Sequence, residues 1–299
     1  MSRAEDSDRW APPDLTGRVA VVTGASRGVG RGIAEVLGAS GATVYVVART
    51  LRAQGRSGID DVVEAITGAG GVAYAAACDV GDDKAVAALF ERLTSEQGRL
   101  DILVNNAVGW GDVRAEGWEG VEDTMTYMVK PAWEMPAGWW DANFRVGVRS
   151  HYIVTKAAIP LMMKDESGGV VFFTSERRPE IPGMQELVLD LRASAVERLA
   201  LLWSLHLRPR GIASVLLYPG FTRTEGIEKS FATGGAYFEG WTEERFLSET
   251  ASIYYSGRAT AVLAADALLM ERTGSVLTAA EVAREYGFTD VSGAQPDPD

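Results

Sequence analysis

Cysteine and histidine are scarce in this sequence, which limits the chemistry that it can support. Its 299 residues include one cysteine, Cys78, and two histidines. A lone cysteine cannot form an internal disulfide, and it fits the reducing conditions of the cytoplasm. With so few nitrogen and sulfur ligands available, we expect no metal centre.

An excess of basic charge and long apolar runs are also lacking. The chain has 29 Lys and Arg against 41 Asp and Glu, a formal net charge of -12. Nucleic acids and anionic membrane surfaces attract basic proteins, so we expect neither as a partner. No apolar run approaches the roughly 18 residues of a membrane span, and Met1 to Asp14 has no apolar core typical of a signal peptide. We therefore expect a cytoplasmic protein that acts on a small molecule.

What the chain does have is a regular alternation of short apolar runs and longer helical patterns. The runs rich in β-branched residues lie at 18–23, 42–48, 71–80, 100–105, 170–174, 212–217 and 275–278. They are apolar throughout, which is typical of parallel strands that helices cover on both faces. We predict an α/β fold with a single doubly wound parallel sheet of about seven strands, flanked by helices.

The domain organisation follows from the same pattern. We expect one domain over residues 16–290, a disordered lead at 1–15 and a flexible tail at 291–299. Two aromatic segments, near 107–140 and 221–256, interrupt the alternation as loop insertions. Both follow strands at the edge where open α/β sheets bind ligands. Their aromatic side chains either pack these loops onto the body or cover a substrate, and the sequence leaves both open.

A glycine-rich turn joins the first predicted strand to the first predicted helix. It reads Thr-Gly-Ala-Ser-Arg-Gly-Val-Gly over residues 23–30. Glycines in such a turn let main-chain N–H groups approach a pyrophosphate at the helix N-terminus. The residues that we expect to contact a dinucleotide here are Gly24, Ser26, Arg27, Gly28, Val29 and Gly30.

Further motifs follow later predicted strands: Cys78-Asp79-Val80, Asn105-Asn106-Ala107, and Pro219-Gly220 with Thr224. Together with the glycine turn, they resemble the short-chain dehydrogenase/reductase (SDR) family over residues 16–280, and residues 146–152 and 283–288 resemble one branch of it. The resemblance implies a Rossmann-type fold and a nicotinamide dinucleotide. It implies adenine contact by Asp79, a cofactor wall at Asn105 and Ala107, and nicotinamide contact near Thr224. The expected cofactor site also includes Val80, Pro219 and Gly220.

Charge favours NADP(H) over NAD(H). A dinucleotide site that prefers NAD usually places an acid after the second strand. Here that strand ends Val-Ala-Arg49-Thr50, and Arg27 lies within the glycine turn. Two guanidinium groups suit a 2′-phosphate, whereas the alternative is two solvated surface arginines.

The catalytic residues implied by the resemblance are an Asn, a Ser, and a Tyr four residues before a Lys. Ser175 ends the fifth predicted strand, at the serine position, and Gly147 stands at the asparagine position. Spacing from Gly211 places Leu189 at the tyrosine position and Ala193 at the lysine position, and a shift by one residue offers Val188 and Arg192 instead.

The proton donor is therefore missing in either alignment. No Tyr lies between Tyr152 and Tyr218, and no Lys lies between Lys164 and Lys229. Loss of a general acid typically costs a factor of about 10²–10⁴ in rate. Side chains that could take its place are Glu176, Arg177, Glu186, Arg192 and His151, with Tyr127 and Tyr254 if the aromatic segments fold over the site. For each of these, a structural role is the simpler interpretation, and the sequence does not choose among them.

Three functions are compatible with these residues. The first is an NADP(H)-dependent oxidoreductase that reduces an imine, an iminium ion or an activated carbonyl of a small metabolite. The second is a non-redox enzyme, such as a cyclase or isomerase, and the third is a catalytically silent binding subunit. The retained glycine turn favours the first. Wide apolar faces over 137–164 and 186–207 also predict a homodimer or homotetramer.

Overall fold

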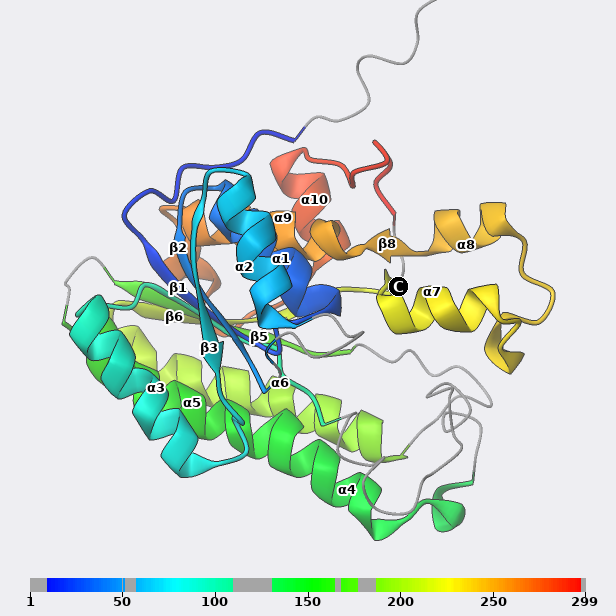
Figure 1. Ribbon diagram of the computed structural model, residues 1–299, viewed down its shortest axis with the longest axis horizontal. Coiled ribbons are helices and arrows are strands. Elements are labelled where there is room, and N and C mark those ends of the chain that lie inside the picture. Colours follow the sequence, from blue (N-terminus) through cyan, green and yellow to red (C-terminus); the bar gives the residue numbers. More distant parts are fainter. Residues whose placement is uncertain are drawn as a thin grey trace, which may run out of the picture.

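A seven-stranded sheet forms the centre of the protein (Figure 1), with the strand order β3-β2-β1-β4-β5-β6-β9. The computed structural model describes residues 10–49, 51, 58–109, 131–164, 168–176 and 187–296. All neighbouring strands of this sheet pair in parallel. The strands are β1 (Val19–Thr23), β2 (Thr43–Ala48), β3 (Val72–Ala77), β4 (Ile102–Asn105), β5 (Gly169–Thr174), β6 (Ile212–Tyr218) and β9 (Val276–Thr278). The predicted fold class, a Rossmann-type doubly wound sheet, is confirmed.

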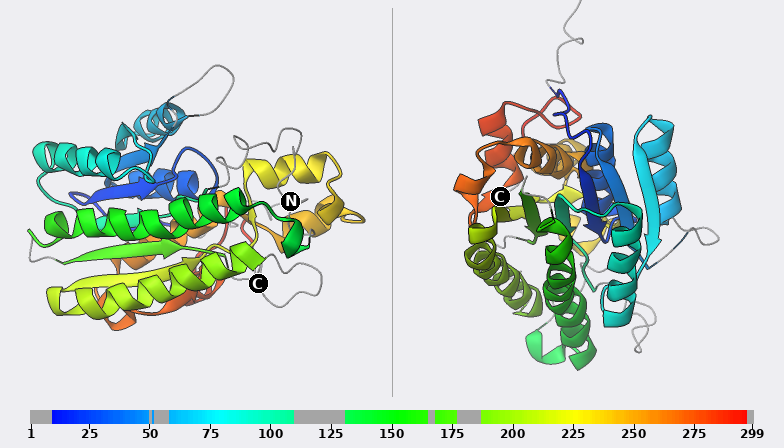
Figure 2. Two further views of the ribbon diagram at one scale, coloured as in Figure 1. Left: turned by 90° about the horizontal axis from the view of Figure 1, so that it is seen from below. Right: turned by 90° about the vertical axis from the view of Figure 1, so that its left-hand side faces the viewer.

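Helices cover both faces of this sheet (Figure 2). One layer holds α1 (Gly28–Ala39), α2 (Ile59–Gly68), α9 (Ile253–Ala265) and α10 (Ala279–Tyr286). The other holds α3 (Asp83–Glu96), α5 (Ser150–Met162) and α6 (Leu187–Leu207). Alternate residues of β1 enter different cores, since Ala20 and Val22 pack in the first layer and Val19 and Val21 in the second. Burial on both faces explains why the strands read as continuous apolar runs.

The helix expected over 137–164 is present but not uniform. It consists of α4 (Ala137–Phe144), a π-helical turn η4 (Arg145–Arg149) and α5, following a short 3₁₀ turn, η3 (Ala132–Glu134). A π turn holds one more residue than an α turn, and such turns are frequent at functional sites. Here it contains Gly147, so the sequence analysis missed a distortion at one of its candidate positions.

The segment 221–256 differs from the loop that we expected. It contains β7 (Thr222–Arg223), α7 (Glu225–Ala232), η6 (Ala236–Phe238), α8 (Glu243–Glu249) and β8 (Ala251–Ser252), and it projects from the body as an arm (Figure 1). Thr224 and Thr242 cap the two helices, and each is followed by a glutamate in the first turn. Aromatic rings of the arm pack against one another, among them Phe221, Phe231, Phe238 and Phe246.

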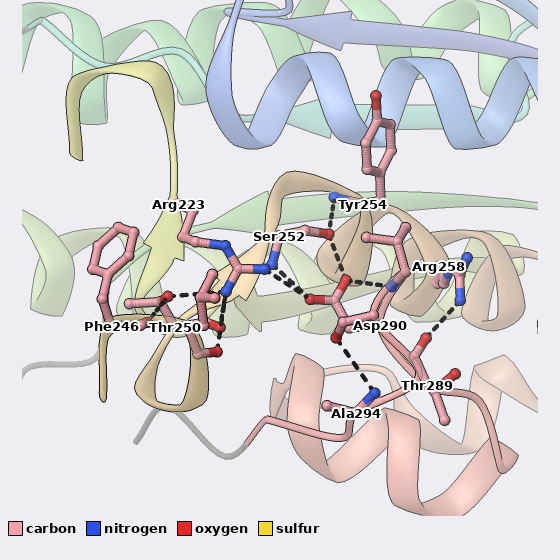
Figure 3. Close-up of polar contacts among 12 residues, drawn as sticks. Arg223, Phe246, Thr250, Ser252, Tyr254, Arg258, Thr289, Asp290 and Ala294 are labelled. Carbon is pink, nitrogen blue, oxygen red and sulfur yellow. Dashed lines mark hydrogen bonds and ion pairs between the residues drawn. The ribbon is translucent and has the colours of Figure 1, made fainter. Parts of the chain in front are cut away.

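The base of the arm is tied to the C-terminal segment by a buried carboxylate (Figure 3). Asp290 is 1% exposed, accepts a hydrogen bond from the Ser252 main-chain N–H at 2.8 Å, and lies 3.5 Å from Arg223 Nη2. Arg223 Nη1 also donates to Thr250 Oγ1 at 3.0 Å. The paired strands β7 and β8 are thus fixed to the residues that follow α10.

Two further 3₁₀ turns are η5 (Arg208–Arg210) after α6 and η7 (Leu269–Arg272) before β9. The described parts of the expected lead and tail contact the domain. Trp10 packs edge-on against Phe288, Leu15 is 1% exposed, and Gln295 Nε2 donates to the Phe288 carbonyl at 2.7 Å. Among the described residues, no helix combines the length and the apolar character needed to cross a membrane.

Candidate functional site

The glycine turn lies between β1 and α1 and is pressed against the end of β4. Gly24 has φ +67°, and a Cβ atom there would lie 2.8 Å from Ala107 Cα. A Cβ atom on Gly30 would lie 2.4 Å from Asn106 Nδ2 and 2.6 Å from the Gly24 carbonyl oxygen. No larger residue fits at either position unless the main chain moves. The structure thus brings together the turn and Ala107, two elements of the expected cofactor site.

Asn106 joins the ends of three strands, a role that the sequence analysis did not assign to it. Its Nδ2 donates to the Thr23 carbonyl at 2.9 Å, and its Oδ1 accepts from Thr174 Oγ1 at 3.1 Å. Asn105, expected as a cofactor wall, is fully buried and donates from Nδ2 to Thr155 Oγ1 at 2.9 Å. The Asn105 side chain therefore holds β4 to α5 instead of lining the turn.

The N-terminus of α1 is occupied by a carboxylate of the arm. The Gly28 N–H donates to Glu225 Oε2 at 2.9 Å, and a Cβ atom on Gly28 would lie 3.2 Å from Thr224 Cγ2. Helix N-termini attract anions, because their first N–H groups lack partners within the helix. Glu225 was not among the expected site residues, although its place directly after Thr224 is a signal that could have found it.

The two arginines expected to bind a 2′-phosphate come after neighbouring strands, β1 and β2. Arg27 precedes α1 and Arg49 follows β2, and both are exposed. Thr23 pairs with Val47, so the glycine turn and Arg49 leave the sheet at the same edge. Ser26 and Val29 are half-buried in the same turn.

Asp79, expected to contact adenine, follows β3. Its Oδ1 accepts from the Gly81 N–H at 2.8 Å, and its Oδ2 lies 3.8 Å from Arg145 Nη1. Val80 beside it is 5% exposed. Arg145 comes from the π-helical turn, and the sequence analysis did not single it out.

The chain turns from β6 into the arm at Pro219 and Gly220. Gly220 has φ +76°, and its carbonyl accepts from Thr222 Oγ1 at 3.1 Å. Thr224 then begins α7 by accepting from the Ile227 N–H at 3.4 Å. These residues place the start of the arm against the start of α1.

The positions expected for the catalytic residues lie around the end of β5. Ser175 directly follows β5 and is 9% exposed. Leu189 on α6 is fully buried in a small apolar cluster with Trp139, Ala142 and Val188. Ala193 is 6% exposed on the same helix. The side chain at the expected tyrosine position is therefore a packing contact with α4.

The Arg192 side chain lies against Gly147, the expected asparagine position. Its Cδ lies 2.6 Å from the point that a Cβ atom on Gly147 would occupy, and its Nη2 lies 2.8 Å from Glu176 Oε2. The Arg192 side chain is 3% exposed, against 38% for Glu176. The absence of a side chain at Gly147 is what leaves room for the arginine.

His151 lies one helical turn after Gly147 and is buried. Its Nε2 is 3.1 Å from the Ala107 carbonyl oxygen, so this nitrogen carries the proton. Burial, together with the positive charge of Arg192, lowers the pKa of His151 to about 4, although the hydrogen bond to the Ala107 carbonyl acts in the opposite direction. His151 is therefore a neutral imidazole near pH 7, and it cannot replace a tyrosine as a cationic acid there.

Comparison with known proteins agrees with this geometry. The profile of the short chain dehydrogenase family matches residues 18–234. This chain belongs to the short-chain dehydrogenase/reductase family. It is therefore an SDR oxidoreductase, built on a fold that binds a nicotinamide cofactor.

Several SDR relatives match over most of their length. Dehydrogenase/reductase SDR family member 1 of Homo sapiens is 33% identical over 289 residues, which is 93% of this chain and 85% of the relative. A short-chain dehydrogenase/reductase from Mycobacterium marinum has a TM-score of 0.70 at 26% identity, covering 89% of this chain and 94% of its own. An angucycline C-6 ketoreductase with bound NADP has a TM-score of 0.68 at 28% identity, covering 89% and 95%. The predicted family is confirmed.

The remaining candidate proton donors are Tyr127, Arg177, Glu186 and Tyr254. Tyr127, Arg177 and Glu186 lie outside the described residues. Tyr254 begins α9 and bonds to Glu35 on α1, and burial raises the pKa of its hydroxyl. Within the described parts of the chain, no group of three His, Cys, Asp or Glu residues could hold a metal ion.

Proposed function

We propose that this SDR protein transfers hydride from NADPH to a small-molecule imine, iminium ion or activated carbonyl. The observation that carries the proposal is the contrast within the site. The glycine turn is closely packed at Gly24 and Gly30. Leu189, at the expected tyrosine position, is instead buried among apolar side chains. An acceptor that is already activated needs no tyrosine acid.

The residues present fit a dinucleotide. A Cβ atom would fill the space over the turn at Gly24 and Gly30. The Glu225 carboxylate on the Gly28 N–H is an anion at the start of α1, which supports the binding of a pyrophosphate there. Gly24, Ser26, Gly28, Val29 and Gly30 would hold the pyrophosphate, Asp79 and Val80 the adenine, and Thr224 the nicotinamide. When bound, the dinucleotide supplies the hydride.

NADP(H) is preferred over NAD(H) in this proposal. Arg27 and Arg49 are exposed at one edge of the sheet, where guanidinium groups suit a 2′-phosphate. A solved relative of 28% identity has NADP bound, which supports the same choice. Titration of the protein with NADPH and NADH, followed by nucleotide fluorescence, tests it. Arg49→Ala should abolish the preference for NADPH, and Arg210→Ala, on the exposed η5 turn, should not. Equal affinities of the wild type for NADPH and NADH would contradict the proposal.

Turnover distinguishes this function from the alternatives. NADPH oxidation should be measurable with cyclic iminium ions or conjugated carbonyls, and should be slow with simple saturated ketones. Ser175→Ala should slow carbonyl reduction by about 10²–10³-fold if Ser175 orients the oxygen, and should hardly affect an iminium ion. Tight NADPH binding without oxidation by any acceptor would favour a non-redox enzyme or a binding subunit.

We also propose that the protein is a homodimer or homotetramer of the cytoplasm. Tyr152 on α5 and Leu202 and Leu205 on α6 are 44%, 41% and 63% exposed, which leaves apolar area for a symmetric contact. Light scattering at micromolar concentration should give a multiple of the chain mass, and Leu205→Glu should lower it. A monomeric wild type would contradict the assembly.

A further inference from the structure

Arg192 is a buried cation with an unused hydrogen-bond donor. Among the described residues its Nε–H has no partner, while Nη2 is paired with Glu176 at 2.8 Å. A buried donor without a partner is destabilising, so its presence calls for a reason. The Arg192 side chain runs from Gly147, beside its Cδ, to Glu176, beside its Nη2. Gly147 and Ser175, which precedes Glu176, are both expected catalytic positions.

Other buried polar atoms are also unsatisfied, and one of them belongs to His151, a side chain that the Arg192 charge reaches. Asn105 Oδ1, Asn143 Oδ1 and His151 Nδ1 are buried and have no partner within the described parts of the chain. Since His151 carries its proton on Nε2, its Nδ1 is an acceptor. All three are acceptors, whereas Arg192 Nε is a donor on a cationic side chain. A ligand that binds Arg192 must therefore offer a negative or strongly polarised oxygen.

We propose that Arg192 binds the developing oxyanion of the substrate, and that the substrate is an α,β-unsaturated carbonyl compound. This inference rests on the proposed reductase function and narrows its substrate class. A guanidinium group is permanently charged, so it stabilises an oxyanion but does not act as a proton donor. The same charge repels an iminium ion, which is the other acceptor that needs no acid.

The reaction balances without a tyrosine. The β-carbon of the substrate accepts hydride from NADPH, and the electron pair of the C=C bond moves to form an enolate with its charge on oxygen. That oxygen pairs with Arg192, and the α-carbon then takes a proton from water. The products are a saturated carbonyl compound, NADP⁺ and hydroxide. An enolate is a much weaker base than the alkoxide formed from a saturated ketone. It therefore persists long enough to be protonated by solvent.

The test uses the full chain with matched pairs of acceptors. Cyclohexenone, cinnamaldehyde and benzylideneacetone are each compared with their saturated counterparts and with a cyclic iminium ion, under NADPH labelled with deuterium at the transferred position. We expect the conjugated compounds to be reduced, with deuterium on the β-carbon. In heavy water, deuterium should also appear on the α-carbon.

Variants of Arg192 test its role. Arg192→Met should lower turnover of the conjugated carbonyl by about 10²–10³-fold without changing NADPH affinity, and added guanidinium should partly restore turnover in Arg192→Ala. Arg198→Met removes the same charge from an exposed position of α6 and should change neither property. A measurement independent of turnover is the binding of nitrophenol, an enolate analogue. The wild type should favour the coloured phenolate form, and Arg192→Met should not.

The outcomes separate this inference from the proposed function. If only the iminium ion is reduced, or if Arg192→Met reduces the conjugated compounds at the wild-type rate, the role of Arg192 is overturned and the reductase function stands. Deuterium on the carbonyl carbon would also overturn it. If no acceptor oxidises NADPH, the proposed function fails, and the inference fails with it.

Discussion

The two halves of the candidate site are built from different kinds of atoms. Around α1, the site consists of main-chain groups that glycines bring close together, as at Gly24 and Gly30. Around α6, it consists of side chains, and these include the buried Leu189 and the ion pair of Arg192 with Glu176. A main-chain cradle needs only the right backbone, whereas proton transfer needs a particular side chain. The fold can therefore keep its cofactor geometry while the chemistry beside it changes.

The halves are nevertheless in contact. Asn106 accepts from Thr174 at the end of β5 and donates to Thr23 at the end of β1. The single side chain of Asn106 therefore connects the catalytic half of the site to the glycine turn. The predictions below disturb one half at a time and measure whether the other responds.

The largest effect is expected in the glycine turn. Gly30→Ala places a methyl group 2.4 Å from Asn106 Nδ2 and 2.6 Å from the Gly24 carbonyl, so the turn must open. We expect the opening of the turn to lower NADPH affinity by more than about 100-fold. Overpacking here should also cost roughly 1–3 kcal/mol of stability. Fluorescence titration measures the affinity. Gly68→Ala is the matched control, since nothing lies within 4 Å of its added methyl group; equal affinities for the two variants would contradict the close approach.

A second prediction concerns the charge state of the catalytic half. Burial lowers the pKa of His151 from 6.5 to about 4, so the unfolded chain binds more protons between these values. Stability should therefore be highest above pH 6.5 and fall on acidification, by about 3 kcal/mol once the pH is below 4. Urea unfolding at several pH values measures this slope.

Two variants isolate the contribution of His151. His151→Gln keeps a donor for the Ala107 carbonyl but does not titrate, so it should flatten the slope between pH 5 and pH 6.5, roughly the range below the ordinary histidine pKa. His206→Gln changes the exposed second histidine and should leave the slope unchanged. An identical slope in His151→Gln and the wild type would show that His151 is not buried in its neutral form.

Restoring the residues implied by the family sharpens the comparison. Leu189→Tyr with Ala193→Lys inserts a hydroxyl group into the apolar cluster of Trp139 and Ala142. We expect a loss of about 1–3 kcal/mol in stability and no reduction of saturated ketones, because Arg192 still fills the space beside Gly147. Adding Gly147→Asn and Arg192→Ser should allow ketone reduction.

The control for this series is Leu191→Tyr on the exposed face of α6, where the side chain is 44% exposed. It should cost little stability, as measured by thermal unfolding. Ketone reduction by the first double variant at the same rate as by the fourfold variant would contradict the expectation that the Arg192 side chain fills the space beside Gly147.

The sequence predicted the parallel sheet and the glycine turn because both depend on local patterns. Apolar runs identify buried strands, and Gly24, Gly28 and Gly30 mark where side chains are excluded. The helices α7 and α8 were missed because they are short and hold few apolar residues, of which Phe231 and Phe246 pack on each other within the arm. Arg192 was considered as one of several charges and as the lysine position of a shifted alignment. Its contact with Gly147 was not predicted, since it joins two helical segments far apart in the chain. Sequence spacing within one helix carries no information about such a contact.

The smallest expected effect lies where the arm meets the cofactor half. Glu225 accepts from the Gly28 N–H at 2.9 Å, at a helix N-terminus that would otherwise serve a pyrophosphate. Glu225→Gln keeps an acceptor but removes the negative charge that competes with the dinucleotide. Charges at helix termini are typically worth about 0.3–1 kcal/mol, so NADPH affinity should rise about two- to fivefold. Glu228→Gln, exposed on the same helix, should leave the affinity unchanged in the same fluorescence titration. Unchanged or weaker binding in Glu225→Gln would mean that the dinucleotide does not displace this carboxylate, and that the two halves of the site are independent of the arm.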